Sequence, residues 1–307
     1  MKNKQPITHL ILALEKKLQS HFKDKTLCTQ YAWWLLQAIT GKTEIELISA
    51  NDINWNEQHE HQLEQALDAL INKHMPLQYL LGSTPFAGLD ILVRPPILIP
   101  RPETEEWMCN FIEQLQPFRH EPLWILDLCT GSGCIALALA DALPKARVYA
   151  TDINDAALAL AQENARHNQI SNVTFLHSDI FNEISCEFKF DIIVSNPPYI
   201  DPRSWNTLEP SVRDWEDKNA LIADDHGMAL VKRIIDQAPS YIKANEQLKN
   251  AQIPQLSMEI DATQGQTVST YMKEHAYNQI EILKDLEGKD RIATGRVDYV
   301  APTAHSL

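Results

Sequence analysis

The sequence predicts an α/β fold, with a mostly parallel sheet of seven strands covered by helices on both faces and a small helical domain before it. Three observations carry this prediction. From about residue 123 onward, short apolar runs alternate with helical segments, as is typical of parallel sheets. Before residue 85, apolar residues recur at helical spacing. Between residues 85 and 105, several prolines separate the two regions.

The composition is that of a folded globular protein and argues against several functional classes. The 307 residues are enough for one large or two smaller domains, and 44% of them are hydrophobic. Lys and Arg number 27 and Asp and Glu number 41, so the net charge is −14. Such a charge repels phosphate backbones and opposes a nucleic-acid substrate. No apolar stretch approaches the roughly 18 residues of a transmembrane helix.

The cysteines indicate a reducing compartment. They are odd in number and scattered, which does not suit a disulfide framework. Cys129 and Cys134 have C-x4-C spacing, but no second Cys/His pair at metal-ligand spacing accompanies them, so no metal site is expected. The other three are Cys28, Cys109 and Cys186.

Residues 1–84 are predicted to form the helical domain. An apolar helix contains residues 31–36, and Gly41 is expected to close it. Its Trp33 and Trp34 are expected to be core and domain-contact residues rather than ligand platforms. Residues 59–74 show the spacing of one buried helix face, carried by Leu63, Ala66, Leu67, Leu70 and Ile71.

Residues 85–105 are predicted to be a hairpin-like linker. Two short extended pieces, Leu89–Val93 and Ile97–Ile99, are interrupted by prolines. Residues 106–307 then form the α/β domain, in which the polar stretch Lys243–Gln255 is expected to be a surface insertion.

The α/β domain is predicted to place its ligands at the carboxyl ends of its strands, as open parallel sheets do. Helices are expected at Ile135–Ala142 and Ala156–His167. The strand candidates are Leu123–Leu128, Arg147–Thr151, Val173–Leu176, Phe190–Ser195, Leu256–Ile260, Gln279–Leu283 and Ile292–Arg296.

The most informative strand end is Asn196-Pro197-Pro198-Tyr199. Two successive prolines fix φ and supply no N–H, and a residue before proline is pushed into extended geometry. The Asn196 side-chain oxygen and the Pro197 carbonyl are suited to accept the two hydrogens of a planar NH2 group, while Tyr199 packs against its plane. Taken alone, the tetrapeptide fits a stiff proline-rich turn equally well.

Three earlier strand ends offer a further set of ligand groups. The glycines after the first strand allow a tight turn and a close backbone approach before a helix. Asp152 ends the second strand and is placed to accept ribose hydroxyls, although alone it fits a helix N-cap or a solvated carboxylate equally well. Asp179 and Ile180 follow the third strand and would hold an adenine. The backbone cradle after the first strand consists of Cys129, Thr130, Gly131, Ser132 and Gly133.

This ordered series resembles the class I S-adenosylmethionine-dependent methyltransferases, and Asn-Pro-Pro-Tyr resembles those that methylate an NH2 group. Further motifs resemble the HemK/PrmC family, the N5-glutamine methyltransferases of peptide chain release factors. These motifs are Pro76–Gly82, Leu98–Glu105 and Gly288–Arg296. Several details look closest to the fungal mitochondrial members. Two departures stand out. Bacterial members usually have Gly where Cys129 stands and often have Trp where Ile180 stands, and their glycine-rich turn before the fifth strand is replaced here by the polar stretch ending in Pro254.

The resemblance implies S-adenosyl-L-methionine as cofactor and the glutamine of the Gly-Gly-Gln loop of a class 1 release factor as substrate. It implies that residues 129–133 cradle the cofactor, with Asp152 on the ribose and Asp179 and Ile180 on the base. Asn196 touches both cofactor and substrate. By the same resemblance, the residues that bind the glutamine and carry catalysis are Asn196, Pro197, Pro198 and Tyr199, with Arg101 as a further substrate contact.

Other readings remain open at this level. One is an N5-glutamine methyltransferase of ribosomal protein L3, which shares Asn-Pro-Pro-Tyr. A second is a nucleic-acid amino-group methyltransferase, and a third is a cofactor-fold protein without catalysis. By analogy, the N-terminal helices dock the release factor, and the protein is expected to be a monomer without nucleic-acid or membrane partners. The fungal resemblance favours the mitochondrial matrix, although residues 1–4 make a poor presequence; a bacterial protein would be cytoplasmic.

Overall fold

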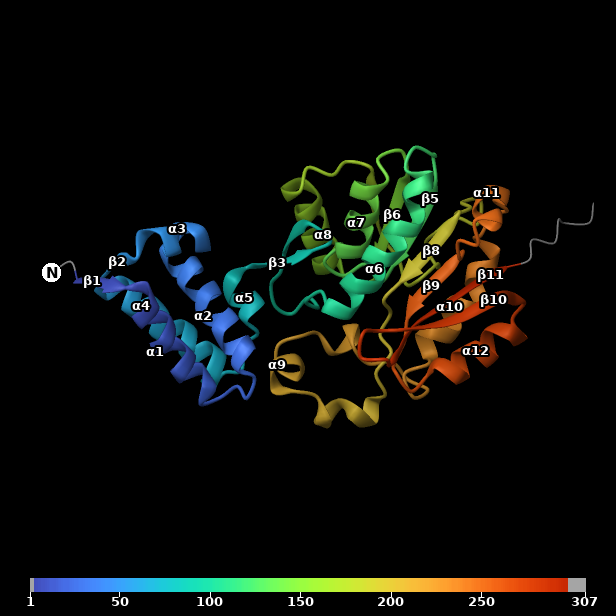
Figure 1. The fold of residues 1–307 in the computed structure, drawn as a ribbon. Helices are drawn as coiled ribbons and strands as arrows, with labels where there is room; N and C mark the ends of the chain where they lie inside the picture. Colours follow the sequence, from blue (N-terminus) through green and yellow to red (C-terminus); the bar gives the residue numbers. More distant parts are fainter. Residues whose placement is uncertain (1–2, 298–307) are drawn as a thin grey trace, which may run out of the picture. The chain divides into compact units, whose positions relative to one another are not determined.

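The computed structural model describes residues 3–297, and the chain divides into two compact units (Figure 1). The first unit consists of the residues up to Ser83 together with Glu209–Trp215. The second consists of Thr84–Leu208 and the residues from Glu216 onward. The sequence-based division assigned residues 209–215 to the α/β domain, but they cluster with the helical unit. No helix within residues 3–297 is both long and apolar enough to cross a membrane.

The first unit is helical, with one short sheet that the sequence patterns did not predict. β1 (Asn3–Pro6) pairs antiparallel with β2 (Asp52–Trp55). The helix predicted at residues 59–74 is α4, which continues into a π-helical turn over Asp68–Asn72. The α-helices are α1 (Ile7–Gln19), α2 (Lys25–Thr40), α3 (Glu44–Ala50), α4 (Glu57–Leu67), α5 (Leu77–Leu81) and the short α9 (Pro210–Arg213).

Local signals set the ends of these helices. The Asp24 carboxylate accepts the N–H groups of Thr26 and Leu27 at the start of α2. Gly41 ends α2 in the left-handed conformation, as predicted. Trp33 and Trp34 are half-buried and pack against the apolar core of this unit, which confirms their expected core role.

The second unit contains the predicted seven-stranded sheet, in the order β10-β11-β9-β8-β5-β6-β7. Strands β9, β8, β5, β6 and β7 are parallel, while β11 is antiparallel to both of its neighbours. All seven candidate strands are confirmed. They are β5 (Trp124–Leu128), β6 (Arg147–Asp152), β7 (Val173–His177), β8 (Ile192–Ser195), β9 (Leu256–Glu259), β10 (Tyr277–Lys284) and β11 (Asp290–Val297).

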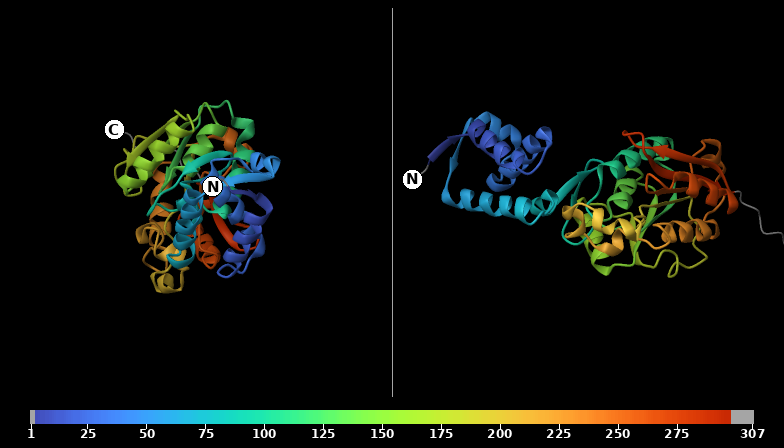
Figure 2. Two further views of the ribbon diagram at one scale, coloured as in Figure 1. Left: turned by 90° about the vertical axis from the view of Figure 1, so that its left-hand side faces the viewer. Right: turned by 90° about the horizontal axis from the view of Figure 1, so that it is seen from below.

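Helices cover both faces of this sheet (Figure 1 and Figure 2). One face carries α6 (Pro102–Leu115), α7 (Cys134–Ala142) and α8 (Asp155–His167), and the other carries α10 (Ala229–Gln237) and α12 (Gly265–Glu274). In the central strands β5, β8 and β9 the side chains are buried on both faces, which explains their continuous apolar runs.

The predicted hairpin is formed by β3 (Ser83–Phe86) and β4 (Leu89–Leu92). Asn164 of α8 pairs with the backbone of Leu92 through both ends of its amide, accepting its N–H at 2.7 Å and donating to its carbonyl at 3.0 Å. The second extended piece, Ile97–Ile99, does not form a strand, because the flanking prolines lack the N–H that a ladder requires.

The surface insertion expected at Lys243–Gln255 is also partly wrong. The segment contains α11 (Glu246–Asn250), and it buries Leu248 and Ile253. The Asn245 amide donates to the buried Asp191 carboxylate at 2.8 Å. The buried Gln255 likewise donates to the Lys243 carbonyl at 2.9 Å, so polarity alone misled the prediction for part of this segment.

Candidate active site

The turn after β5 brings the predicted cradle residues together. Cys129 and Gly131 both have positive φ angles, of 59° and 56°. The Thr130 hydroxyl donates to the buried Asp127 carboxylate at 2.6 Å, and the Thr130 N–H donates to the Thr151 carbonyl. Burial raises the pKa of Asp127 to about 7. The buried Asp127 carboxyl group therefore fixes the turn through Thr130.

The end of this turn packs closely against α8. Gly133 has φ +85° and a Cβ there would lie 2.9 Å from the Ala161 Cβ, so the close approach requires glycine. The Ser132 carbonyl accepts the Asn164 amide at 2.9 Å. By contrast, a Cβ on Gly131 would meet no atom within 4 Å, so the turn borders open space at that residue.

Asp152 ends β6 beside this turn. Its Oδ2 accepts the Gly131 N–H at 2.8 Å, and its Oδ1 accepts the Asn154 N–H at 2.9 Å. Burial raises the pKa of Asp152, although these two N–H groups oppose the increase. The sequence predicted this carboxylate at the strand end, and its hydrogen bond with Gly131 places it next to the cradle.

Asp179 and Ile180 follow β7, with a backbone turn at Ile180, whose φ is +57°. Asp179 Oδ2 accepts the Arg233 guanidinium at 2.8 Å and the Asn182 amide at 3.1 Å. Ile180 is 4% exposed and belongs to the apolar core of this unit. The two residues therefore differ: one is partly exposed and ion-paired, and the other is core.

The Asn-Pro-Pro-Tyr segment leaves the end of β8 next to β5. The Ser195 hydroxyl donates to the Leu128 carbonyl at 2.9 Å, and these two residues are in register between the strands. Asn196 is half-buried, and its Nδ2 donates to the Thr104 hydroxyl oxygen at 3.2 Å. The Tyr199 hydroxyl donates to Glu259 Oε1 at 2.7 Å.

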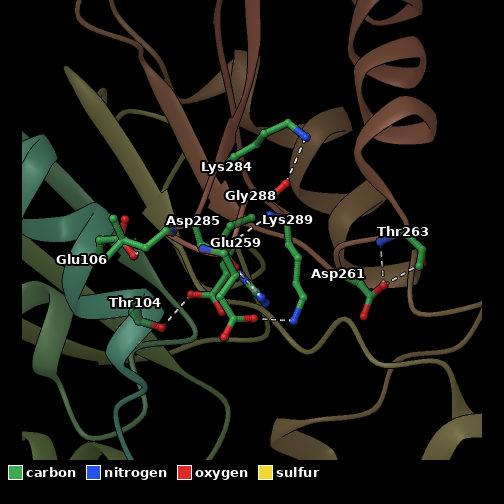
Figure 3. A network of polar contacts seen from close by, with 12 residues as sticks. Thr104, Glu106, Glu259, Asp261, Thr263, Lys284, Asp285, Gly288 and Lys289 are labelled. Atoms are coloured by element: carbon green, nitrogen blue, oxygen red, sulfur yellow. Dashed lines mark hydrogen bonds and ion pairs between the residues drawn. The ribbon is translucent and has the colours of Figure 1, made fainter.

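Thr104 and Glu259 are site residues that the sequence analysis missed. The Thr104 hydroxyl donates to Glu259 Oε2 at 2.7 Å, and both residues are at most 2% exposed (Figure 3). Thr104 stood inside a motif assigned to the linker, and Glu259 stood inside a candidate strand. The available signal was the charge itself, because a carboxylate in a buried apolar strand requires partners.

The Tyr199 backbone is held as tightly as its side chain. The Gln264 amide donates to the Tyr199 carbonyl at 3.0 Å. Gly227 has φ +84° and lies so close that a Cβ there would be 1.9 Å from the same carbonyl oxygen. Two residues distant in sequence therefore fix the position of the strand-end tyrosine.

Arg101, a predicted substrate contact, forms an ion pair with Glu216. The Glu216 side chain is fully buried, whereas that of Arg101 is 30% exposed. Burial raises the pKa of Glu216, against the lowering effect of Arg101. Among residues 3–297 no group of His, Cys, Asp and Glu side chains is arranged to hold a metal ion.

Two family models match this chain. The family model "PrmC N-terminal domain" matches residues 15–82, and "Methyltransferase small domain" matches residues 110–209. A solved structure of the hMettl16 catalytic domain in complex with MAT2A 3'UTR hairpin 6 covers 80% of this chain and 83% of that chain. Its TM-score of 0.51 at 16% identity shows a shared fold.

Curated relatives match both units. The release factor glutamine methyltransferase of Flavobacterium psychrophilum is 34% identical over 278 residues, which is 90% of this chain and 93% of that protein. The release factor glutamine methyltransferase of Salmonella typhimurium is 36% identical over 262 residues, which is 85% of this chain and 90% of that protein. The chain spans 64% of the longer relative from Fusobacterium nucleatum. These relatives are bacterial, so closeness to fungal mitochondrial members stays a prediction. The chain belongs to the HemK/PrmC family of release factor glutamine methyltransferases, with the class I S-adenosylmethionine-dependent methyltransferase fold.

Proposed function

We propose that this chain methylates the side-chain amide nitrogen, N5, of the glutamine in the Gly-Gly-Gln motif of a class 1 peptide chain release factor. Its family supports the substrate class. The observation that carries the proposal is the junction of two strand ends. Ser195 and Leu128 are in register and hydrogen-bonded, so Asn196 and Cys129 leave the sheet as neighbours.

The strand-end residues fit S-adenosylmethionine. The open space beside Gly131 leaves room for a ligand against the backbone of residues 129–133. Asp152 presents a carboxylate at the next strand end, where it would accept ribose hydroxyls. Asp179 uses only Oδ2 in its bonds to described residues, so Oδ1 would be free to contact the base, with Ile180 beside it.

S-adenosylmethionine supplies an electrophilic methyl group on a sulfonium sulfur. The glutamine nitrogen is a poor nucleophile because its lone pair is delocalised into the carbonyl, so the protein must align it. Asn196 Oδ1 and the Pro197 carbonyl would each accept one of its N–H groups and stabilise the positive charge that develops on nitrogen. Tyr199 would pack against the amide plane, with Pro198 stiffening the segment. The extra proton leaves after transfer, so no strong base is required beforehand.

The decisive measurement is methyl transfer from radiolabelled S-adenosylmethionine to a class 1 release factor and to its Gly-Gly-Gln→Gly-Gly-Ala variant. We expect incorporation into the first substrate only, and its loss in the Asn196→Ala enzyme. Equal labelling of both substrates contradicts the glutamine assignment. Ribosomal protein L3 serves as the comparison substrate, and faster labelling of L3 than of the release factor favours that alternative.

The finer points of the proposal concern the cellular setting. We infer that the chain acts as a monomer on a release factor docked by the helical unit. A mitochondrial release factor is the substrate implied by the fungal resemblance, whereas the bacterial relatives favour a bacterial one. Relative kcat/KM on the two release factors tests this point, and imaging of a C-terminally tagged protein tests the matrix location.

A further inference from the structure

The orientation of the Asn196 side-chain amide follows from the hydrogen bonds of a buried carboxyl group, that of Glu259. Both oxygens of Glu259 accept a hydrogen bond: Oε1 from the Tyr199 hydroxyl at 2.7 Å and Oε2 from the Thr104 hydroxyl at 2.7 Å. Thr104 has a single hydroxyl hydrogen, and it points to Glu259 (Figure 3). Toward Asn196, 3.2 Å away, Thr104 can therefore only accept.

The only donor in the Asn196 side chain is Nδ2, so Nδ2 must face the Thr104 hydroxyl. Amide orientations are assigned from the hydrogen-bond network, and here the network allows one choice. With Nδ2 on Thr104, Oδ1 lies on the opposite side of the amide carbon. The strand end therefore presents the acceptor Oδ1 together with the Pro197 carbonyl, which is also an acceptor.

We propose that Glu259 and Thr104 are positioning residues that hold Asn196 in its accepting orientation, and thereby make the site select a neutral glutamine amide over a glutamate carboxylate. This inference rests on the proposed function. A glutamine NH2 brings two donors to two acceptors, whereas a glutamate carboxylate brings only acceptors and is repelled. If Asn196 turned over, its Nδ2 would face the substrate and the site would offer a donor to a carboxylate.

Side chains from three parts of the fold surround Glu259. Four neighbours face it: Thr104 and Trp107 from α6, Tyr199 after β8, and Arg291 from β11. Burial raises the pKa of Glu259, whereas the hydroxyl donors and Arg291 act in the opposite direction. Since Glu259 is 1% exposed, water does not compete for its oxygens.

The variants Thr104→Val, Thr104→Ser and Glu259→Gln test the inference in the full-length chain. Valine keeps the shape of threonine but cannot accept from Asn196, whereas serine keeps the hydroxyl. Glutamine at position 259 has a donating end, so it can reverse the hydrogen bond through Thr104 and turn the Asn196 amide. The readout is the ratio of the Ki of a Gly-Gly-Glu peptide to the KM of the matching Gly-Gly-Gln peptide.

We expect this ratio to fall about 10-fold or more in Thr104→Val and Glu259→Gln, the loss expected for a mispaired polar contact in a specificity site. Thr104→Ser should restore the wild-type ratio. Circular dichroism and urea denaturation show whether the three variants are folded. If Thr104→Val does not fold, the Thr104→Ser and Glu259→Gln pair carries the same comparison.

Two results would overturn the inference. One is a wild-type ratio in folded Glu259→Gln. The other is a fall of the ratio in Thr104→Ser as large as the fall in Thr104→Val. A failure of the proposed function itself is a different result, because the wild-type enzyme would then transfer no methyl group to the Gly-Gly-Gln peptide.

Discussion

At the scale of single residues, the site depends on glycines packed so closely against their neighbours that no side chain fits between them. The Tyr199 carbonyl is bonded by Gln264 and lies against Gly227, where any side chain would overlap it. Similarly, Gly133 leaves no room for a Cβ beside Ala161. These glycines are required by space as well as by their positive φ, which is why a conservative change there is predicted to be costly.

Gly227→Ala is predicted to abolish most of the methyl transfer. The new Cβ would lie 1.9 Å from the Tyr199 oxygen, so the carbonyl must move and lose its bond to Gln264. A displacement of this size can reduce kcat about 100-fold. The control is Gly288→Ala, which has a similar φ of +79° but meets no atom within 4 Å. Equal activity of the two variants would contradict the steric explanation.

Arg101→Ala is predicted to destabilise the fold by about 1–3 kcal/mol at neutral pH, because the buried Glu216 carboxylate loses its cation. Removing Arg101 raises the pKa of Glu216 further above its ordinary value. A raised native pKa means that the folded state favours the proton, so protonation relieves the cost as the pH falls.

The stability gap between Arg101→Ala and wild type should therefore narrow from neutral toward acidic pH and be widest above the raised Glu216 pKa. Urea unfolding at several pH values measures it. A gap that widens on acidification would show that Glu216 is not the group responsible.

At the scale of elements, single helices connect the site to its supports. α6 begins with Arg101 as its N-cap and places Thr104 in its first turn, so one helix start carries both the Glu216 pair and the Glu259 contact. α8 lies against the cradle through Ala161 and also holds β4 through Asn164. The hairpin and the cradle are thus two contacts of the same helix.

Asn164→Leu is predicted to destabilise the protein by about 2–4 kcal/mol, because three backbone groups lose their partner: the buried carbonyl of Ser132 and the part-buried N–H and carbonyl of Leu92. Asn168 pairs with Asp90 in the same way but is partly exposed, so water replaces its contacts. Asn168→Leu is therefore the matched control, expected to cost under about 1 kcal/mol. Urea denaturation compares the two, and equal losses would contradict the role of burial.

At the scale of the whole molecule, the charge of −14 constrains the substrate. The fold is shared with an RNA-bound methyltransferase domain, but affinity for nucleic acid depends on neutralising phosphates with Lys and Arg. The net charge therefore favours a protein over a nucleic-acid substrate, a choice that the shared fold leaves open.

We predict that an excess of RNA does not inhibit methyl transfer to a release factor at low salt, and that fluorescence anisotropy detects no binding of a labelled RNA hairpin. The physical reason is the repulsion between the acidic protein and the phosphates. Inhibition that weakens as salt is added would indicate a basic groove and would revive the nucleic-acid alternative.

Much of the fold could be predicted because its signals are local. The seven strands are apolar runs bounded by turn residues, and Gly41 ends its helix through its own backbone freedom. The error at Lys243–Gln255 has a local cause as well, because the polarity of the segment indicated a surface insertion.

The sequence by itself determined the order of the strands along the chain, and with it the residues that follow each strand: Gly131, Asp152, Asp179 and Asn196. It did so because parallel strands bring their carboxyl ends to one edge. Only the tertiary structure decided what these residues contact. Thr104 meets Glu259 across 155 positions, and Arg101 meets Glu216 across 115. No spacing rule encodes such pairs, because a buried charge takes whichever partner the packing of distant elements brings within reach.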